Sequence, residues 1–308
     1  MTPWILGIDT SGPRCGVALL QGERVAGVEE LAAPGTNRAL MPAIDRLCRR
    51  AGIGPRRLDG IAVALGPGSF TGLRIGLATA KGLAVALGRP LAGVGTLEAV
   101  ASAAAGGDGG TGVMRNRLVV RRARRDEFYA AAFDPSGRRL WGPDVVAADA
   151  LAAFLGPRGG HPARSPIPTG AGVPEGRPAD LPGGRSAGAP PAGVGDPPSP
   201  GALDGGAAGA GWVVVVDPAD GAALGLAAAV APTAPAGGTV DATGAGHADV
   251  MVVPDPGAVP VAVARLARRR LEAGGDDPAT LVPLYLPAGS TFRPYPGAAQ
   301  GSPAPDRG

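Results

Sequence analysis

The sequence is poor in several residue types that carry protein chemistry. Aromatic residues make up 4% of its 308 residues, and it contains two histidines and two cysteines. The cysteines, Cys15 and Cys48, give no disulfide framework and no metal-ligand spacing. Because both lie in apolar patterns, we expect buried thiols in a reducing compartment. The formal net charge of +3 is too small to indicate nucleic-acid binding by itself.

Long apolar runs are also missing. Asp9 interrupts the first apolar stretch, so we expect no signal peptide. No uninterrupted apolar span reaches the length of a membrane helix, which predicts a cytoplasmic protein with no membrane partner. Glycine and proline are abundant instead, with 53 and 34 residues. The chain is long enough for two domains, and its composition predicts a folded part and a poorly ordered part.

The first 104 residues have the pattern of a mixed α/β domain. Short apolar runs separated by glycine turns predict strands, and apolar residues at helical spacing predict helices. We expect strands at residues 4–8, 15–20, 24–31, 61–65 and 91–94, and helices at 37–51, 70–87 and 96–104. Beyond them, we expect strands at 118–124 and 127–133, and a loop with a short helix at 140–155.

The clearest local pattern is Gly-Pro-Gly-Ser-Phe-Thr-Gly-Leu-Arg-Ile-Gly, from Gly66 to Gly76. It joins an apolar strand to a helix. Gly66 and Gly68 allow backbone angles that other residues avoid, and Ser69 or Thr71 supplies a helix cap. Such a helix start is able to bind an anion or simply packs a helix on a strand. The spacing matches neither the dinucleotide fingerprint nor the P-loop.

The first strand ends in Asp9-Thr10-Ser11. This arrangement resembles the first phosphate loop of the actin/hexokinase/Hsp70 superfamily, whose carboxylate holds a metal-bound water and whose backbone N–H groups hold phosphate. Alternatively, Asp9 only ends the strand and orders the turn through its side chain. So short a motif favours the second interpretation.

The residues from Gly66 to Gly76 resemble the signature of the TsaB (YeaZ) family, bacterial accessory subunits for making threonylcarbamoyladenosine in tRNA. Residues 5–11, 81–84 and 93–99 agree with the same family. The resemblance implies a two-lobed actin/Hsp70-like (ribonuclease H-like) α/β fold. The second lobe would be smaller and interrupted by a low-complexity segment.

We therefore divide the chain into six parts. They are a first ribonuclease H-like lobe, the start of the second lobe, a disordered Gly/Pro/Ala-rich segment, the remainder of the second lobe, a C-terminal helix that packs on the first lobe together with a terminal segment, and a disordered tail. In order, these parts cover residues 1–104, 113–155, 156–211, 212–254, 255–287 and 288–308.

Two positions depart from the family pattern. Arg122 stands where the family has the Asp of Asp-Ala-Arg-x-x-Glu-Val-Tyr, and Pro287 stands where it has a terminal Arg. The lost carboxylate argues against ATP hydrolysis. The arginines around Arg122 could meet RNA or an acidic partner, although such a run is more often a solvated strand face.

The resemblance implies a non-catalytic accessory subunit that pairs with TsaD and supports threonylcarbamoyl transfer to the adenosine next to the tRNA anticodon. TsaE would join the complex and tRNA would be met indirectly, while the state without TsaD, homodimer or monomer, stays open. This chain would need no cofactor or metal, and any ATP would be bound in the complex. The expected partner contacts are Leu40, Ile44 and Leu73, and the expected phosphate-loop remnant comprises Asp9, Thr10, Ser11, Gly66, Gly68 and Ser69.

Two other functions remain open from the residues. The first is an ATP-binding or peptidase-like enzyme of the same superfamily. Against it, His161 and His247 lie in glycine-rich stretches far from Asp9 in sequence, and no nucleophile has a plausible histidine partner. The second is a structural domain whose second half has decayed, with a chain poorly folded beyond about Phe154.

Overall fold

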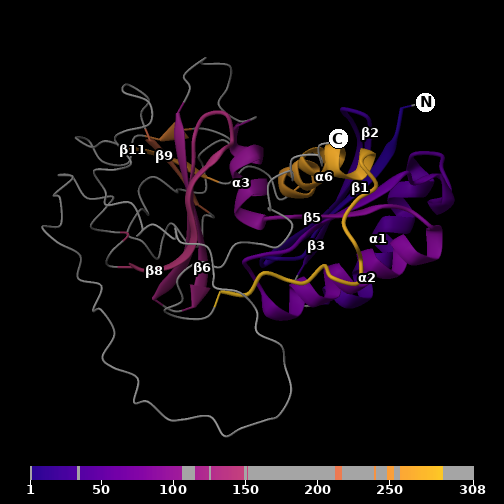
Figure 1. The fold of residues 1–308 in the computed structure, drawn as a ribbon, viewed down its shortest axis with the longest axis horizontal. Coiled ribbons are helices and arrows are strands. Elements are labelled where there is room, and N and C mark those ends of the chain that lie inside the picture. The colour runs from indigo at the N-terminus through magenta and orange to yellow at the C-terminus, as the bar shows by residue number, and fades with distance from the viewer. Residues whose placement is uncertain are drawn as a thin grey trace, which may run out of the picture. The chain divides into compact units, whose positions relative to one another are not determined.

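The structure is a computed structural model that describes residues 2–32, 35–105, 115–124, 126–148, 151, 212–216, 239–240, 248–252 and 257–286. The disorder predicted for residues 156–211 and 288–308 lies outside these described residues. Within them, the chain forms a five-stranded sheet and a six-stranded sheet, each accompanied by helices (Figure 1).

The first sheet has the strand order β3-β2-β1-β4-β5. The first three strands form an antiparallel meander, and β4 and β5 then add in parallel to β1. Short glycine turns such as the one at Gly22, with φ of 62°, make the meander possible. The strands are β1 (Trp4–Asp9), β2 (Arg14–Gln21), β3 (Arg24–Ala32), β4 (Gly60–Ala64) and β5 (Leu91–Val94).

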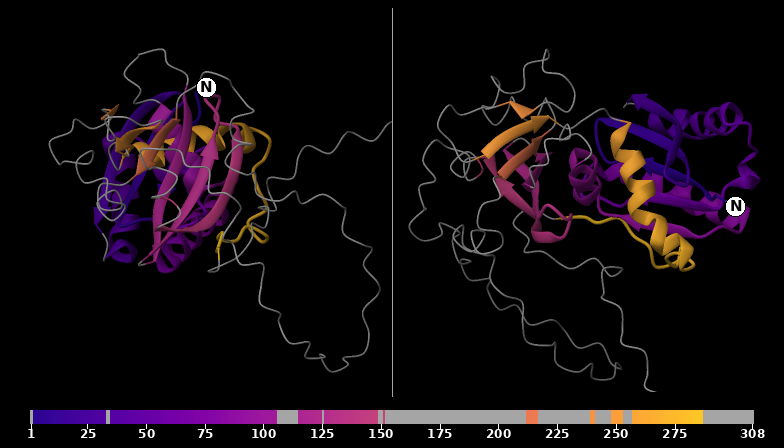
Figure 2. Two further views of the ribbon diagram at one scale, coloured as in Figure 1. Left: turned by 90° about the vertical axis from the view of Figure 1, so that its left-hand side faces the viewer. Right: turned by 90° about the horizontal axis from the view of Figure 1, so that it is seen from above.

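Helices cover both faces of the first sheet. The helices are α1 (Thr36–Arg50), α2 (Phe70–Leu87), α3 (Thr96–Ala105) and α6 (Ala258–Glu272), with a short 3₁₀ turn η1 (Pro55–Arg57) before β4. Successive side chains of β1 point to opposite faces. Leu6 and Ile8 join the core under α1 and α2, whereas Ile5 joins the core under α6. In Figure 2 the gold helix α6 lies along the strands of this sheet, and its contacts run from β1 and β2 to β4 and β5.

The second sheet has the strand order β10-β11-β9-β6-β7-β8. Val119 and Val215 face the core shared with α3 and α6, whereas Val120 and Phe128 face a separate core on the other side. The strands are β6 (Asn116–Arg124), β7 (Glu127–Phe133), β8 (Arg139–Ala147), β9 (Trp212–Val216), β10 (Thr239–Val240) and β11 (Ala248–Val252).

Two parts of the second half differ from expectation. Residues 139–147 form strand β8, so the prediction of a loop and short helix from residue 140 was wrong there. Most of this strand is only half-buried and contains Gly142-Pro143, so its sequence has no alternating pattern to reveal it. Residues 213–216 and α6 belong to the hydrophobic cores, which argues against a decayed second half.

Among the described helices, α2 is the one that is long and apolar enough to cross a membrane by length and composition alone. A helix that covers one face of a sheet can pass the same test. One side of α2 packs on β4, β1 and β5, and Arg74 and Lys81 interrupt its apolar sequence.

Candidate functional site

The turn between β4 and α2 has the predicted strand–glycine–helix form. Gly66 has a φ of 109°, a value that favours glycine, and an added Cβ there would lie 2.7 Å from the carbonyl oxygen of Leu284. Ser69 precedes the first helical residue, and its hydroxyl accepts a hydrogen bond from the Gly72 N–H at 3.2 Å. Ser69 is therefore confirmed as the N-cap of α2.

Small residues bring the start of α2 against the end of β1. An added Cβ on Gly68 would run into the carbonyl oxygen of Ser11, and one on Gly72 would run into that of Thr10. Hydrogen bonds hold the contact. The Ser69 N–H donates to the Ser11 carbonyl at 2.7 Å, and the Thr10 hydroxyl donates to the Gly72 carbonyl at 2.7 Å. Asp9, Thr10, Ser11, Gly68 and Ser69 of the predicted phosphate-loop remnant thus lie at one contact, whereas Gly66 lies against Leu284 and donates its N–H to the Thr96 hydroxyl.

The Asp9 carboxylate is turned toward its own loop. Asp9 is 2% exposed, and its Oδ1 accepts hydrogen bonds from the N–H of Ser11 at 2.9 Å and from the Ser11 hydroxyl at 2.6 Å. A buried carboxylate needs such donors, because an unpaired charge is costly away from water. The geometry therefore supports the interpretation in which Asp9 orders the turn.

An arginine of the second sheet reaches this loop. Arg121 on β6 donates from Nη1 to the Ser11 hydroxyl at 3.0 Å. An added Cβ on Gly12 would run into Nη2 of the same guanidinium, so the group lies directly over the loop backbone. Sequence reasoning missed this residue because Arg121 is one of several arginines in a run, and only the register of β6 separates it from the others.

Cys15 lies next to the loop, but its thiol is not poised for reaction. Its Sγ donates to the Gly12 carbonyl at 3.3 Å and accepts from the Thr36 hydroxyl at 3.6 Å. Burial raises the pKa of the Cys15 thiol and the charge of Asp9 raises it further, while the Thr36 hydrogen bond and Arg121 act in the opposite direction. Thr36 is the first residue of α1, and this helix has no side-chain cap at its N-terminus.

The residues around Asp9 do not fit a metal-bound phosphate. Both hydrogen bonds to Oδ1 come from Ser11, and the Arg121 guanidinium donates to the same Ser11 hydroxyl that bonds to Asp9. Arg122, at the position of the family's second-lobe Asp, has its guanidinium carbon 6.0 Å from the centre of the Phe128 ring. Among the described residues, no group of three or more His, Cys, Asp or Glu side chains is arranged to hold a metal ion.

The side chains expected to contact a partner are inside the chain. Leu40, Ile44 and Leu73 are 1%, 2% and 0% exposed, so they belong to the core and cannot reach a partner in this structure. Periodicity identified an apolar face correctly, but that face covers the first sheet. The exposed large apolar side chains of α1 and α2 are Met41, Phe70 and Val85.

A second group of residues that the sequence pattern did not indicate lies at the start of α2. The Arg74 guanidinium stacks 3.8 Å above the exposed Phe70 ring, and Arg74 Nε donates to the Tyr285 hydroxyl at 3.1 Å. The Phe70 and Tyr285 rings are 5.0 Å apart. Tyr285 belongs to the segment after α6, whose Leu284 N–H donates to the Leu65 carbonyl at 2.7 Å. This segment thereby fastens the turn before α2.

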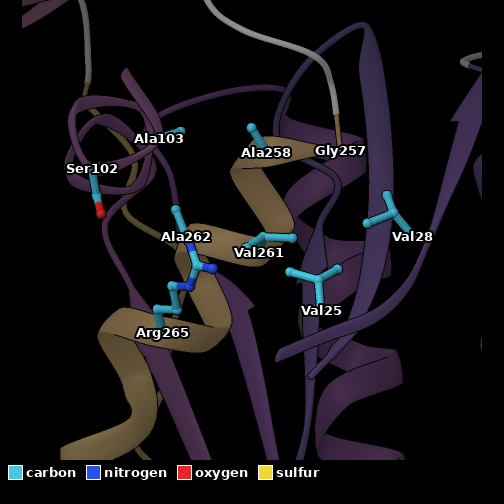
Figure 3. A pocket seen from close by; sticks show the side chains of 9 residues that line it. All are labelled: Val25, Val28, Ser102, Ala103, Gly257, Ala258, Val261, Ala262 and Arg265. Atoms are coloured by element: carbon cyan, nitrogen blue, oxygen red, sulfur yellow. The ribbon is translucent and has the colours of Figure 1, made fainter. Parts of the chain in front are cut away.

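A separate pocket of about 280 Å³ lies between β3, α3 and α6 (Figure 3). Its wall is mainly apolar, and Ser102 and Arg265 supply the polar side chains. Arg265 Nε lies 3.9 Å from a carboxylate oxygen of Glu23. The described lining contains no carboxylate, histidine or cysteine, so it offers no general acid or base to activate the Ser102 hydroxyl.

Comparisons with known proteins agree with the motifs. The family model described as "TsaD: tRNA N6-adenosine threonylcarbamoyltransferase" matches residues 28–165. The chain is 38% identical over 100 residues to the tRNA threonylcarbamoyladenosine biosynthesis protein TsaB of Haemophilus influenzae, covering 32% of this chain and 42% of that protein. It is 34% identical over 137 residues to TsaB of Escherichia coli, covering 44% of this chain and 58% of that protein. The chain thus spans about half the length of these curated relatives.

The fold has a solved counterpart. The structure of YeaZ from Pseudomonas aeruginosa superposes with a TM-score of 0.57 at 22% identity, covering 92% of this chain and all of that one. At this identity the likeness concerns the fold, and it confirms the predicted two-lobed α/β architecture.

Proposed function

We propose that this chain is a TsaB-like (YeaZ-like) protein and a non-catalytic accessory subunit in threonylcarbamoyladenosine biosynthesis, a proposal supported by its similarity to curated TsaB proteins and by its fold. It pairs with TsaD in the cytoplasm, TsaE joins the pair, and tRNA is met through the complex. The chain needs no cofactor of its own, and ATP is bound by the assembled complex.

The observation that carries the proposal is the outer face of α2. This helix is mainly apolar, interrupted by Arg74 and Lys81, yet only 28% of it is buried within the chain. Val85 is 75% exposed and Phe70 is 53% exposed, and Met41 on the neighbouring α1 is 48% exposed. Exposed apolar and aromatic side chains are typical of the centre of a protein–protein interface.

The outer face of α2 is also suited to a helix of a partner. Ala78, Gly82, Val85 and Ala86 are exposed at helical spacing, and none of them carries a charge. Small side chains let a second helix approach closely, and Val85 then fills the space between the two axes. At the start of α2, the stacked Phe70 provides an aromatic anchor of the kind that often dominates binding energy.

The described residues also support a role without catalysis. The Asp9 carboxylate is engaged by Ser11, and the Cys15 thiol is buried with a raised pKa. Neither group is placed to attack a substrate or to exchange a proton with one, because both are closed off by their own neighbours. The contribution of this chain is therefore a surface that stabilises one conformation of its partner.

The test is co-purification of the full chain with TsaD from the same cell, followed by size-exclusion chromatography and calorimetric titration. The wild-type proteins should form a one-to-one complex. Val85→Arg should weaken binding roughly 100-fold or more, because it buries an unpaired charge in the interface. Val25→Arg is the matched control, since Val25 is an exposed valine on β3 that lines the pocket against α3 and α6 and is not part of the α2 face.

Three outcomes would contradict the proposal. Separate elution of the two wild-type proteins would show that TsaD is not a stable partner of this chain. Full binding by Val85→Arg would place the interface elsewhere, and equal losses in Val25→Arg and Val85→Arg would show that charge alone, not the α2 face, is responsible. Leu40→Arg is unsuitable for this test, because Leu40 is buried and its replacement would unfold the chain.

A further inference from the structure

The contact between Arg121 and Ser11 differs from the contact made by Arg124, another arginine of β6. Arg124 is on the surface, and its Nε lies 4.0 Å from a carboxylate oxygen of Glu127 on the same hairpin. Arg121, by contrast, joins the second sheet to the loop after β1, a hydrogen bond between residues 110 positions apart. It adds a polar link between two parts of the chain that also meet through apolar side chains of the shared core.

The direction of both hydrogen bonds at the Ser11 hydroxyl is fixed by its two partners. A guanidinium only donates and a carboxylate only accepts, so Ser11 must accept from Arg121 and donate to Asp9. The two distances, 3.0 Å and 2.6 Å, fit this arrangement. Asp9 and Ser11 are 2% and 3% exposed, so water cannot replace the Arg121 guanidinium as the donor to Ser11 without opening the contact.

We propose that the Arg121 guanidinium is a built-in cation for the Asp9 loop, which takes the place of a metal ion beside this carboxylate and couples the second sheet to the start of α2. Arg121 is a positioning residue, because it acts on Asp9 through the Ser11 hydroxyl. The loop is consequently closed to a metal-bound phosphate, in agreement with the poor fit of its residues to such a group.

The link continues from Ser11 into α2. The Ser11 carbonyl accepts the N–H of Ser69, and Ser69 caps the helix. Thr10 adds a second connection through the Gly72 carbonyl. A displacement of Ser11 after loss of Arg121 must therefore also displace the first turn of α2, although Arg121 itself does not touch that helix.

Hydrogen exchange of the full chain, followed by mass spectrometry, measures this coupling directly. We expect Arg121→Ala to exchange the amides of Ser11 and Ser69 about 10-fold faster than wild type, because the opening that exposes them becomes easier. Arg124→Ala is the matched control on the same strand and should exchange these amides as wild type does. Adding methylguanidinium at about 10 mM should restore protection in Arg121→Ala, because binding of the small cation stabilises the closed loop.

Each result decides a separate part of the proposal. Wild-type exchange in Arg121→Ala would overturn the coupling. Equal restoration by methylguanidinium and by sodium chloride at the same ionic strength, or by neither, would overturn the built-in cation. Slower exchange at these amides when magnesium and ATP are added to wild type would show that the loop does take a metal-bound phosphate.

Three further variants keep the proposal testable if Arg121→Ala does not fold. Ser11→Ala keeps the arginine and removes the bridging hydroxyl, so it should also speed exchange at Ser69. Arg121→Lys keeps the charge and should retain more protection there than Arg121→Gln, which keeps a donor without charge. Equal exchange in Arg121→Lys and Arg121→Gln would contradict a role for the positive charge.

Discussion

The same substitution at two glycines of α2 should change stability in opposite directions. Gly82 is exposed in the middle of the helix, and an added Cβ there meets nothing within 4 Å. Gly82→Ala should therefore stabilise the chain by about 0.5–1 kcal/mol, because alanine loses less backbone entropy in a helix than glycine. Gly72 lies in the first turn, where the added Cβ runs into the carbonyl oxygen of Thr10.

At Gly72 the gain in helix propensity is outweighed by the clash. Relieving an added methyl group in a tight contact costs about 1–3 kcal/mol. The movement also weakens the 2.7 Å hydrogen bond from the Thr10 hydroxyl to the Gly72 carbonyl, which is worth about 1 kcal/mol. Gly72→Ala should therefore destabilise the chain by about 1–3 kcal/mol after the propensity gain is subtracted.

Urea unfolding of each isolated variant, followed by circular dichroism, gives its free energy of unfolding. The folded variants should have the same helix content as the wild type. The melting temperatures should move in opposite directions, by about 2–4 °C for each kcal/mol. If both variants were stabilised, the start of α2 would not be held against the end of β1. The account of Ser69, Gly68 and Gly72 as one closely packed contact would then be wrong.

Two further changes test individual hydrogen bonds. The buried Thr96 hydroxyl accepts a hydrogen bond from the Gly66 N–H at 3.0 Å, and Thr96→Val removes it. Thr96→Val should lower the free energy of unfolding by about 1–3 kcal/mol. Thr96→Ser keeps the hydroxyl and should cost less in the same denaturation assay. The hydrogen bond from Arg46 lowers the pKa of Glu29 below its usual value of 4.5. The ionised Glu29 carboxylate therefore stabilises the fold fully above pH 4.5, and this stabilisation is lost as the pH falls through the lowered pKa of the folded state. Glu29→Gln should reduce the melting temperature at pH 7 by the equivalent of less than about 1 kcal/mol and leave it unchanged near pH 2; an equal loss at both pH values would contradict the ion-pair explanation.

The elements of the first sheet could be predicted from sequence because local signals agree there. The strands β1, β4 and β5 are short apolar runs between turn residues, and α2 begins at a serine cap after Gly66-Pro67-Gly68. Strand β8 could not be found, because its half-buried residues lack a period of two. Its place is set by pairing with β7, which is a tertiary interaction.

The candidate site was predictable in part. Asp9 and Ser69 were found because a carboxylate at a strand end and a hydroxyl at a helix start have local roles. The link from Arg121 joins segments far apart in sequence and depends on strand register, so no local pattern marks it. Leu40 and Leu73 were wrong as contact residues, because an apolar face read from periodicity is the same whether it meets the core or a partner.

The packing of α6 on the first sheet has a consequence for how the chain is made. The five strands of this sheet are complete by residue 94, but the helix that covers one of their faces begins at residue 258. At ribosomal rates of about 5–20 residues per second, that face stays uncovered for roughly 10–30 s. Ile5, Leu20 and Val94 remain open to other chains during this interval. Folding of the first lobe must therefore finish after synthesis of nearly the whole chain, and a fragment ending at residue 105 should aggregate rather than form an independent domain.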